Sequence, residues 1–211
     1  MRVTKKIKEE QLAILEETYR GAKPELVFSN AFELLIAVIL SAQCTDKRVN
    51  VTTARLFQKA ATPEAILEMG LAQLEEEIRD CGLFRNKAKN ILAACQILCE
   101  KYGGQVPDSF ADLESLPGVG RKTANVVMSV AFHHPAIAVD THVFRISNRL
   151  KLAVGTTPLE VEKELQRVIP REKWSDAHHW LIWHGRKICK ARKPLCGTCP
   201  LADVCPSVMA E

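Results

Sequence analysis

A lysine and an aspartate stand where each could take part in covalent chemistry. Lys122 follows the glycine-rich turn at 117–120, and Asp140 comes eighteen positions later. We expect Lys122 in the first turn of a helix, where the partial positive charge of the helix N-terminus disfavours the ammonium form. A neutral amine is a nucleophile that can form a Schiff base. Asp140 is expected to begin the next helix, where backbone N–H groups favour its carboxylate form.

The turn before Lys122 also indicates a class of ligand. Gly118 and Gly120 flank Val119, and glycine lets the backbone take positive φ and approach a partner closely. Amides at the start of the following helix form an anion site, whose usual occupant is phosphate. With one helix ending near Leu116 and another over 121–132, the segment predicts a helix-hairpin-helix that holds a phosphodiester backbone without reading bases. The alternative is a helix corner with no ligand.

Four of the eight cysteines share a short segment near the end of the sequence. They have the spacing C-x6-C-x2-C-x5-C and are Cys189, Cys196, Cys199 and Cys205. Four thiolates in one compact loop can enclose a zinc ion or an iron–sulfur cluster, and the thiolates alone leave both open. Disulfides are disfavoured because the chain has no secretory signal and cytosolic thiols stay reduced. The other four cysteines lie in apolar helical stretches and are expected to pack in the core.

Charge and hydropathy favour a protein that binds a polyanion and disfavour a membrane protein. The 211 residues carry a formal net charge of +4, which is a mild indication of a polyanionic partner. Basic residues gather at 2–8, 85–89 and 186–193, whereas 64–80 is strongly acidic. The longest apolar run, at 34–42, is too short to cross a bilayer. We therefore expect no membrane partner and a cytoplasmic location, associated with the nucleoid in a bacterium.

Helical signals cover the chain, and no run alternates with period two for long enough to predict a strand. Predicted helices span 32–43, 46–60, 63–70, 71–81, 87–102, 121–132 and 159–169, with a last helix starting at Ser175. Asn30, Thr62 and Thr157 are expected to cap helix N-termini. Asp108 or Ser109 is expected to start the first helix of the hairpin. The fold class is therefore all-α.

Several segments together resemble the endonuclease III family of DNA glycosylases. They are LPGVGRKTANVV, VDTH, FELLIAVILSAQCTD, GLFRNKAKNI and the cysteine-rich tail, so the resemblance covers nearly the whole chain. It implies a two-lobed helix-hairpin-helix glycosylase fold with a C-terminal iron–sulfur cluster loop. A helical barrel-like lobe with the hairpin would span 24–134, and a second lobe with the cluster loop would combine 1–23 with 135–211. Lys122 would lie on the first lobe and Asp140 on the second, with the active site in the cleft between them.

The resemblance also implies roles for the candidate residues. In the family, the lysine matching Lys122 attacks the deoxyribose C1′ and the aspartate matching Asp140 assists it. The 6-2-5 cysteine spacing resembles the family's [4Fe–4S] loop, and this decides between zinc and a cluster. The cluster is expected to brace the loop that presents Lys190, Arg192 and Lys193 to DNA phosphates.

An enzyme that acts at C1′ must take the target nucleotide out of the duplex, which leaves a gap. Two positions match the family's gap-filling residues: Gln43, which can hydrogen-bond the orphaned base, and Leu83, which can wedge between bases. Without the family match, Gln43 would be read as an ordinary helix-end residue. Together with the hairpin residues Gly118, Val119 and Gly120, these positions form the expected DNA-binding set.

The expected function is that of a bifunctional DNA glycosylase and AP lyase, acting as a monomer on damaged double-stranded DNA. By resemblance, it removes oxidised or ring-reduced pyrimidines and cleaves abasic sites by β-elimination. A mismatch adenine glycosylase typically lacks the lysine and carries an extra C-terminal domain. A purine-lesion glycosylase with a hairpin lysine would not explain the cysteine loop. The alternative from another class is a non-enzymatic DNA-binding module with a zinc site.

Overall fold

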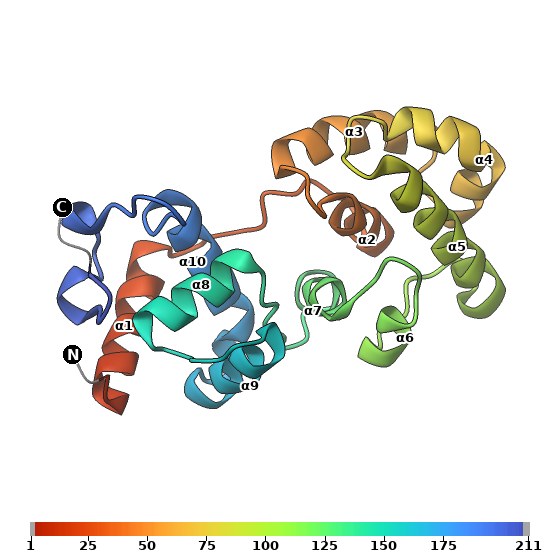
Figure 1. The fold of residues 1–211 in the computed structure, drawn as a ribbon. Helices are drawn as coiled ribbons and strands as arrows, with labels where there is room; N and C mark the ends of the chain where they lie inside the picture. The colour runs from red at the N-terminus through yellow and green to blue at the C-terminus, as the bar shows by residue number, and fades with distance from the viewer. Residues whose placement is uncertain (1–2, 209–211) are drawn as a thin grey trace. The chain divides into compact units, whose positions relative to one another are not determined.

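The protein, described here by a computed structural model over residues 3–208, divides into two compact units (Figure 1). Unit 1 comprises Met1–Lys23 and Pro135–Glu211, and unit 2 comprises Pro24–His134. All regular elements within residues 3–208 are helical, so the all-α prediction is confirmed. No helix in this range is long and apolar enough to cross a membrane. Arg2, from the first predicted basic segment, lies outside the described residues.

Unit 2 is built around one helix that is apolar on all sides. Its helices are α2 (Ala31–Leu40), α3 (Asp46–Lys59), α4 (Pro63–Glu77), α5 (Phe84–Tyr102), α6 (Phe110–Glu114) and α7 (Arg121–Val130). Every residue of α2 from Leu34 to Leu40 is buried, and α2 packs against α3, α5 and α7. A helix without a polar face is stable in water only when neighbours cover it completely. This requirement fixes α2 as the centre of the unit.

Local capping signals set the starts of these helices. The Asn30 side chain accepts a hydrogen bond from the Glu33 amide, and the Thr62 side chain caps α4 ahead of Pro63. Ser109 caps α6, as one of the two predicted candidates. The predicted break at Gly70 is also confirmed, because its φ of 74° interrupts α4 with a kink. At such a φ a glycine avoids the strain that a side chain would bring.

Several helix boundaries in unit 2 differ from the prediction. The helix predicted to reach position 81 ends at Glu77, and the one predicted to reach position 132 ends at Val130. Two further differences lie beside residues with a positive φ. The helix predicted to reach Gln43 ends at Leu40. The Ser41 hydroxyl donates to the carbonyl of Val38 at 2.8 Å, and the chain then turns through Gln43 at a φ of 54°. The helix predicted from position 87 instead begins at Phe84, directly after Leu83 at a φ of 60°. Both differences arise where a non-glycine residue adopts the left-handed region, which propensity does not anticipate.

Unit 1 is centred on its longest C-terminal helix. Its elements are α1 (Lys5–Thr18), α8 (Thr141–Leu150), α9 (Pro158–Val168), η1 (Arg171–Lys173), α10 (Trp174–Lys187), η2 (Cys196–Thr198) and η3 (Ala202–Val204). Both α1 and α8 pack against α10, and α9 packs against α8. The capping box predicted at Thr157 is present. The prediction that Ser175 caps the last helix is wrong, because the turn η1 leads directly into α10 at Trp174.

A buried glutamine joins the beginning of the chain to its end. Gln11, on α1, is fully buried. Its Nε2 donates to the carbonyl of Leu150 at 3.0 Å and to that of Val204 at 2.9 Å. These carbonyls lie at the C-terminus of α8 and beside the cluster loop, where helix or strand partners are lacking. Gln11 therefore fixes α1 to both segments.

We predict that Gln11→Leu destabilises unit 1 while keeping its apolar volume. The substitution leaves two buried carbonyls without a donor, at a cost of about 2 kcal/mol or more. Urea unfolding followed by circular dichroism would measure the loss. Gln96→Leu, at an exposed position of α5, is the matched control and should leave stability within about 0.5 kcal/mol of the wild type. Equal stability of the two variants would contradict this account of Gln11.

Candidate functional site

The hairpin between α6 and α7 contains two glycines, and the structure requires glycine at only one of the two positions. Gly118 has a φ of 79°, and a Cβ there would lie 2.9 Å from the Cβ of Asn90. Backbone conformation and neighbouring atoms therefore both require glycine at 118. Gly120 is the N-cap of α7 in an extended conformation, and a Cβ there would meet nothing within 4 Å. The protein's own packing does not require glycine at 120, so the space beside it is open to a ligand.

Lys122 is the second residue of α7 and is exposed. The first turn of α7 contains no acidic residue, and the N-cap supplies no side-chain hydrogen bond. Ala124 and Val127 bury the opposite side of the helix in the core. Arg121 lies over the ring of Phe110, 5.0 Å from its centroid, and so joins α7 to α6. Core packing on one side thus holds Lys122 toward solvent on the other.

Asp140 is the N-cap of α8 in unit 1. Its Oδ1 accepts a hydrogen bond of 2.8 Å from the amide of Val143. Aspartate is one of the residues preferred at a helix N-cap, where its side chain bonds a free amide. The placement agrees with the predicted helix start, and the bond fixes the orientation of the carboxylate. The two predicted catalytic residues thus come from different units, Lys122 from unit 2 and Asp140 from unit 1.

The structure brings the loops of Gln43 and Leu83 together. Both residues are exposed, with 56% of the Leu83 surface accessible. A Cβ on Gly82 would lie 3.4 Å from the carbonyl oxygen of Gln43, so the two loops touch. Gln43 and Leu83 both occupy the left-handed region, at φ of 54° and 60°. Such conformations cost energy in non-glycine residues and persist only where the surroundings enforce them.

The four candidate metal ligands share one site in unit 1. All four are free thiols, and they line one cavity together with apolar residues such as Leu150 and Ile188. Within residues 3–208 no group of three or more His, Cys, Asp or Glu side chains is arranged to hold a metal ion. Soft thiolates around an apolar cavity are the donor set that iron–sulfur clusters use. The chemistry of the four side chains, rather than their present spacing, therefore matches the donor set of a cluster.

Polar side chains contact the sulfurs of this site from outside. The Nη1 of Arg149 donates to the Sγ of Cys189 at 3.3 Å. The Nε2 of His184 lies 3.8 Å from the Sγ of Cys199, and its Nδ1 lies 3.0 Å from the hydroxyl of Tyr19. Burial lowers the pKa of His184 to about 4 and raises that of Tyr19 to about 12. The neutral imidazole of His184 accepts a hydrogen bond from the Tyr19 hydroxyl at Nδ1. Its single proton is then on Nε2, which faces the Sγ of Cys199.

Arginines from α8 hold the backbone of the cluster loop. Arg149 donates to the carbonyls of Lys190 at 2.8 Å and Ala191 at 3.0 Å. Arg145 donates through its Nε and Nη2 to the carbonyl of Cys189. Burial lowers the pKa of Arg145, and the charge of Arg149 adds to this effect, whereas Cys189 and Asp140 oppose it. The two arginines are one helical turn apart, so one face of α8 positions the loop.

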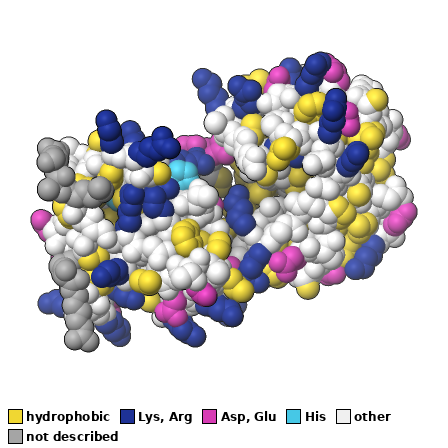
Figure 2. Space-filling view, in the orientation of Figure 1, with side chains coloured by type: hydrophobic (Ala, Val, Ile, Leu, Met, Phe, Trp, Pro, Cys, Tyr) yellow, Lys and Arg dark blue, Asp and Glu magenta, His cyan; other side chains and the backbone are white. Residues whose placement is uncertain are grey.

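The predicted basic residues of this loop face solvent. Lys190, Arg192 and Lys193 are all exposed, and Lys193 has a φ of 51°. In Figure 2, Lys and Arg side chains gather on the visible face of unit 1 over the loop that follows α10. Three cations on a fixed backbone give a surface that suits a polyanion.

Sequence reasoning missed the residues that support the site. Tyr19, Arg149 and His184 are not among the site residues that the sequence predicts. The four-residue spacing of Arg145 and Arg149 was the available signal, because it places both side chains on one face of a helix. Nothing local indicated Tyr19, which is 165 residues away from His184.

Comparison with known proteins identifies the family. Residues 36–171 match the HhH-GPD superfamily of base excision DNA repair proteins, and residues 189–205 match the iron-sulfur binding domain of endonuclease III. The second match confirms the prediction of an iron–sulfur cluster over zinc.

The curated relatives extend over nearly the whole chain. Endonuclease III of Haemophilus influenzae is 53% identical over 205 residues, which cover 97% of this chain and 96% of the relative. Endonuclease III of Escherichia coli is 52% identical over 196 residues, or 93% of each chain.

Solved structures agree with the sequence matches. A trapped endonuclease III–DNA covalent intermediate matches with a TM-score of 0.94 and 51% identity, over 98% of this chain and 97% of that one. A thermostable thymine-DNA glycosylase, at 23% identity and a TM-score of 0.87, supports the fold. The chain therefore belongs to the endonuclease III family of the HhH-GPD superfamily.

Proposed function

We propose that this protein is a base excision repair enzyme, a bifunctional DNA N-glycosylase and AP lyase. The observation that carries the proposal is Lys122. It is an exposed lysine in the first turn of α7, directly after the hairpin, in a member of the endonuclease III family. A relative of 51% identity has been solved as a covalent intermediate with DNA, which supports a nucleophilic mechanism. Lys122 is the residue we assign to that role.

The proposed reaction begins when the neutral Nζ of Lys122 attacks C1′ of a flipped nucleotide. The bond between C1′ and the base nitrogen breaks, and the base leaves with the bonding electrons and takes up a proton. Opening of the sugar ring gives a Schiff base between C1′ and Nζ. Loss of a C2′ proton then expels the 3′ phosphate by β-elimination, and water releases the lysine. The Asp140 carboxylate accepts the lysine proton and stabilises the positive charge that develops on the sugar.

DNA recognition is assigned to three surfaces. The hairpin residues Gly118, Val119 and Gly120 approach a phosphate through the backbone amides at the start of α7. The cluster loop presents Lys190, Arg192 and Lys193 to further phosphates. The cluster itself supplies bonds that brace this loop, and Arg145 and Arg149 hold the loop backbone around it.

Gln43 and Leu83 are assigned to the gap that the flipped nucleotide leaves. Leu83 inserts between bases and holds the kink, while the Gln43 amide hydrogen-bonds the orphaned base. We assign oxidised and ring-reduced pyrimidines, together with abasic sites, as the substrate class because the family resemblance indicates them. We also propose that the protein acts as a monomer in the bacterial cytoplasm, where its DNA substrate lies.

We predict that Lys122→Gln abolishes borohydride trapping on abasic duplex DNA, because an amide cannot form a Schiff base. Affinity for that DNA should stay within about threefold of the wild type, since only one charge is lost. Lys47→Gln is the matched control, because Lys47 is likewise the exposed second residue of a helix, α3. It should trap like the wild type. Continued trapping by the Lys122 variant would assign the nucleophile elsewhere, and a wild type that never traps would favour a non-enzymatic DNA-binding module.

A second prediction concerns the amides at the start of α7. Gly120→Ser introduces a better N-cap, whose hydroxyl occupies an amide that we assign to a phosphate. Stability should be unchanged or slightly raised, because a Cβ at this position meets nothing within 4 Å. Affinity for duplex DNA should fall about tenfold, as expected for the loss of one hydrogen bond to a charged group. Unchanged affinity in a filter-binding titration would remove the start of α7 from the phosphate site.

A third prediction concerns the support of the cluster. The purified protein should be yellow-brown, and Tyr19→Phe should lose this colour faster under air or chelator. The variant lacks the hydroxyl that holds the Nε2 proton of His184 toward the Sγ of Cys199. Absorbance in the blue region, followed over time beside iron analysis, measures the rate. Equal decay in variant and wild type would contradict the role of Tyr19, and a colourless protein with stoichiometric zinc would contradict the cluster.

A further inference from the structure

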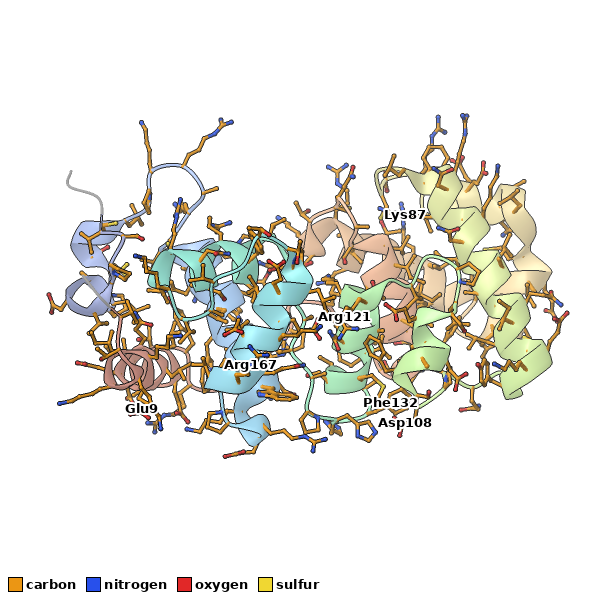
Figure 3. All side chains as sticks on the ribbon, turned by 60° about the horizontal axis from the view of Figure 1, so that its bottom comes forward. Glu9, Lys87, Asp108, Arg121, Phe132 and Arg167 are labelled. Atoms are coloured by element: carbon orange, nitrogen blue, oxygen red, sulfur yellow. The ribbon has the colours of Figure 1, made fainter. Side chains whose placement is uncertain are left out.

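Lys87 is a charged side chain in an environment that normally excludes one. It lies in the first turn of α5 and is only 5% exposed (Figure 3). Burial lowers its pKa. A buried lysine is rare, because an ammonium loses its hydration and needs hydrogen-bond partners inside the protein. Its position on α5 must therefore offer a compensating interaction.

That interaction is with the end of α2. The Nζ of Lys87 donates to the carbonyl oxygen of Leu40 at 2.9 Å. Leu40 is the last residue of α2, and the last four carbonyls of a helix have no partner within the helix. The C-terminus of a helix also carries partial negative charge, which attracts a cation. The ammonium thus supplies both a donor and a favourable charge where α2 stops.

The backbone of Lys87 makes a second connection. Its amide donates to the carbonyl of Leu83 at 3.1 Å, as the first hydrogen bond of α5. Lys87 therefore contacts both loops. Its side chain bonds Leu40, which directly precedes the loop of Gln43, and its backbone amide bonds Leu83. The loops touch directly as well, because Gly82 lies against the carbonyl oxygen of Gln43.

Each loop contains one non-glycine residue with an unfavourable backbone conformation. The φ values of Gln43 and Leu83 lie in the left-handed region, which these side chains rarely adopt. A strained backbone persists only where its surroundings determine it, and such strain concentrates at functional positions. The two strained residues are the ones assigned to the gap in the DNA. Lys87 is the polar group that ties together the chain segments before and after them.

We propose that Lys87 is a positioning residue, which fixes the Gln43 and Leu83 loops as one rigid element for insertion into the DNA. This inference rests on the proposed function. With the loops held in advance, the energy of binding can be used to unstack the base rather than to order two flexible loops. Lys87 would not touch the DNA, and its contribution would reach the reaction only through the two loops.

The test compares two reactions of the same enzyme. Lys87→Met keeps a long apolar side chain but removes the ammonium, and Lys101→Met changes an exposed lysine of the same helix, outside the basic segments, as a control. One reaction is excision of a ring-reduced pyrimidine from duplex DNA, which requires flipping and gap filling. The other is Schiff-base trapping at an abasic site in single-stranded DNA, which leaves no helical gap. Circular dichroism melting confirms that each variant is folded.

We expect Lys87→Met to slow duplex excision by about tenfold or more, since small displacements of remote residues have effects of this size. Trapping on the single strand should stay within about twofold of the wild type, and Lys101→Met should match the wild type in both reactions. Fluorescence of 2-aminopurine opposite the lesion should rise less on binding of Lys87→Met. In a Leu83→Ala background, Lys87→Met should add little to the loss, because both act on one element.

Three outcomes would overturn the inference alone. They are wild-type excision by Lys87→Met, an equal loss in both reactions, and full additivity with Leu83→Ala. If Lys87→Met does not fold, the same two reactions are measured with Lys87→Arg. Its wider guanidinium displaces the end of α2, so the same selective loss of duplex excision is expected. Wild-type duplex excision by that variant would again overturn the inference. A wild-type protein that fails to trap abasic DNA would overturn the proposed function, and this inference with it.

Discussion

Side chains that donate to backbone carbonyls fix the segments of this protein that hydrophobic packing cannot fix. Lys87, Gln11 and Arg149 each reach from a helix to carbonyls at a helix end or in a loop. A carbonyl in such a place has no partner in regular secondary structure, and burying it without a donor is costly. Each of these side chains therefore determines a conformation as well as adding stability. The three sites lie at the two candidate gap-filling loops, at the junction of α1 with the C-terminal segments, and at the cluster loop.

The sequence predicted helix starts well and helix ends less well, for a physical reason. A start such as that of α4 depends on a side chain bonding an amide two or three residues ahead, which is local information. At the end of α2, by contrast, the carbonyl of Leu40 accepts a hydrogen bond from Lys87, which is 47 residues away. The predicted cap at Ser175 was wrong for a different and local reason. The indole of Trp174 donates to the carbonyl of Ile169 and holds the turn that begins α10.

The chemical groups of the site were easier to predict than their support. Lys122 and the four cysteines stand out because their residue types and spacing are unusual. Tyr19, His184 and Arg149 have no such pattern, because they come from different helices and meet only in the folded unit. For Gly120, the structure gives a distinction that the sequence does not. The sequence treats it like Gly118, whereas only Gly118 is required by the protein's own backbone and packing.

The division into units also sets an order for synthesis on the ribosome. Unit 2 is one continuous stretch, so its core can close as soon as that stretch has emerged. Unit 1 joins segments on both sides of unit 2, and the partner of Gln11 at Val204 is synthesised 193 residues after it. The buried contacts of α1 can therefore form only after unit 2 has been synthesised. Contacts of such high sequence separation also make closure of this unit the slower step of folding.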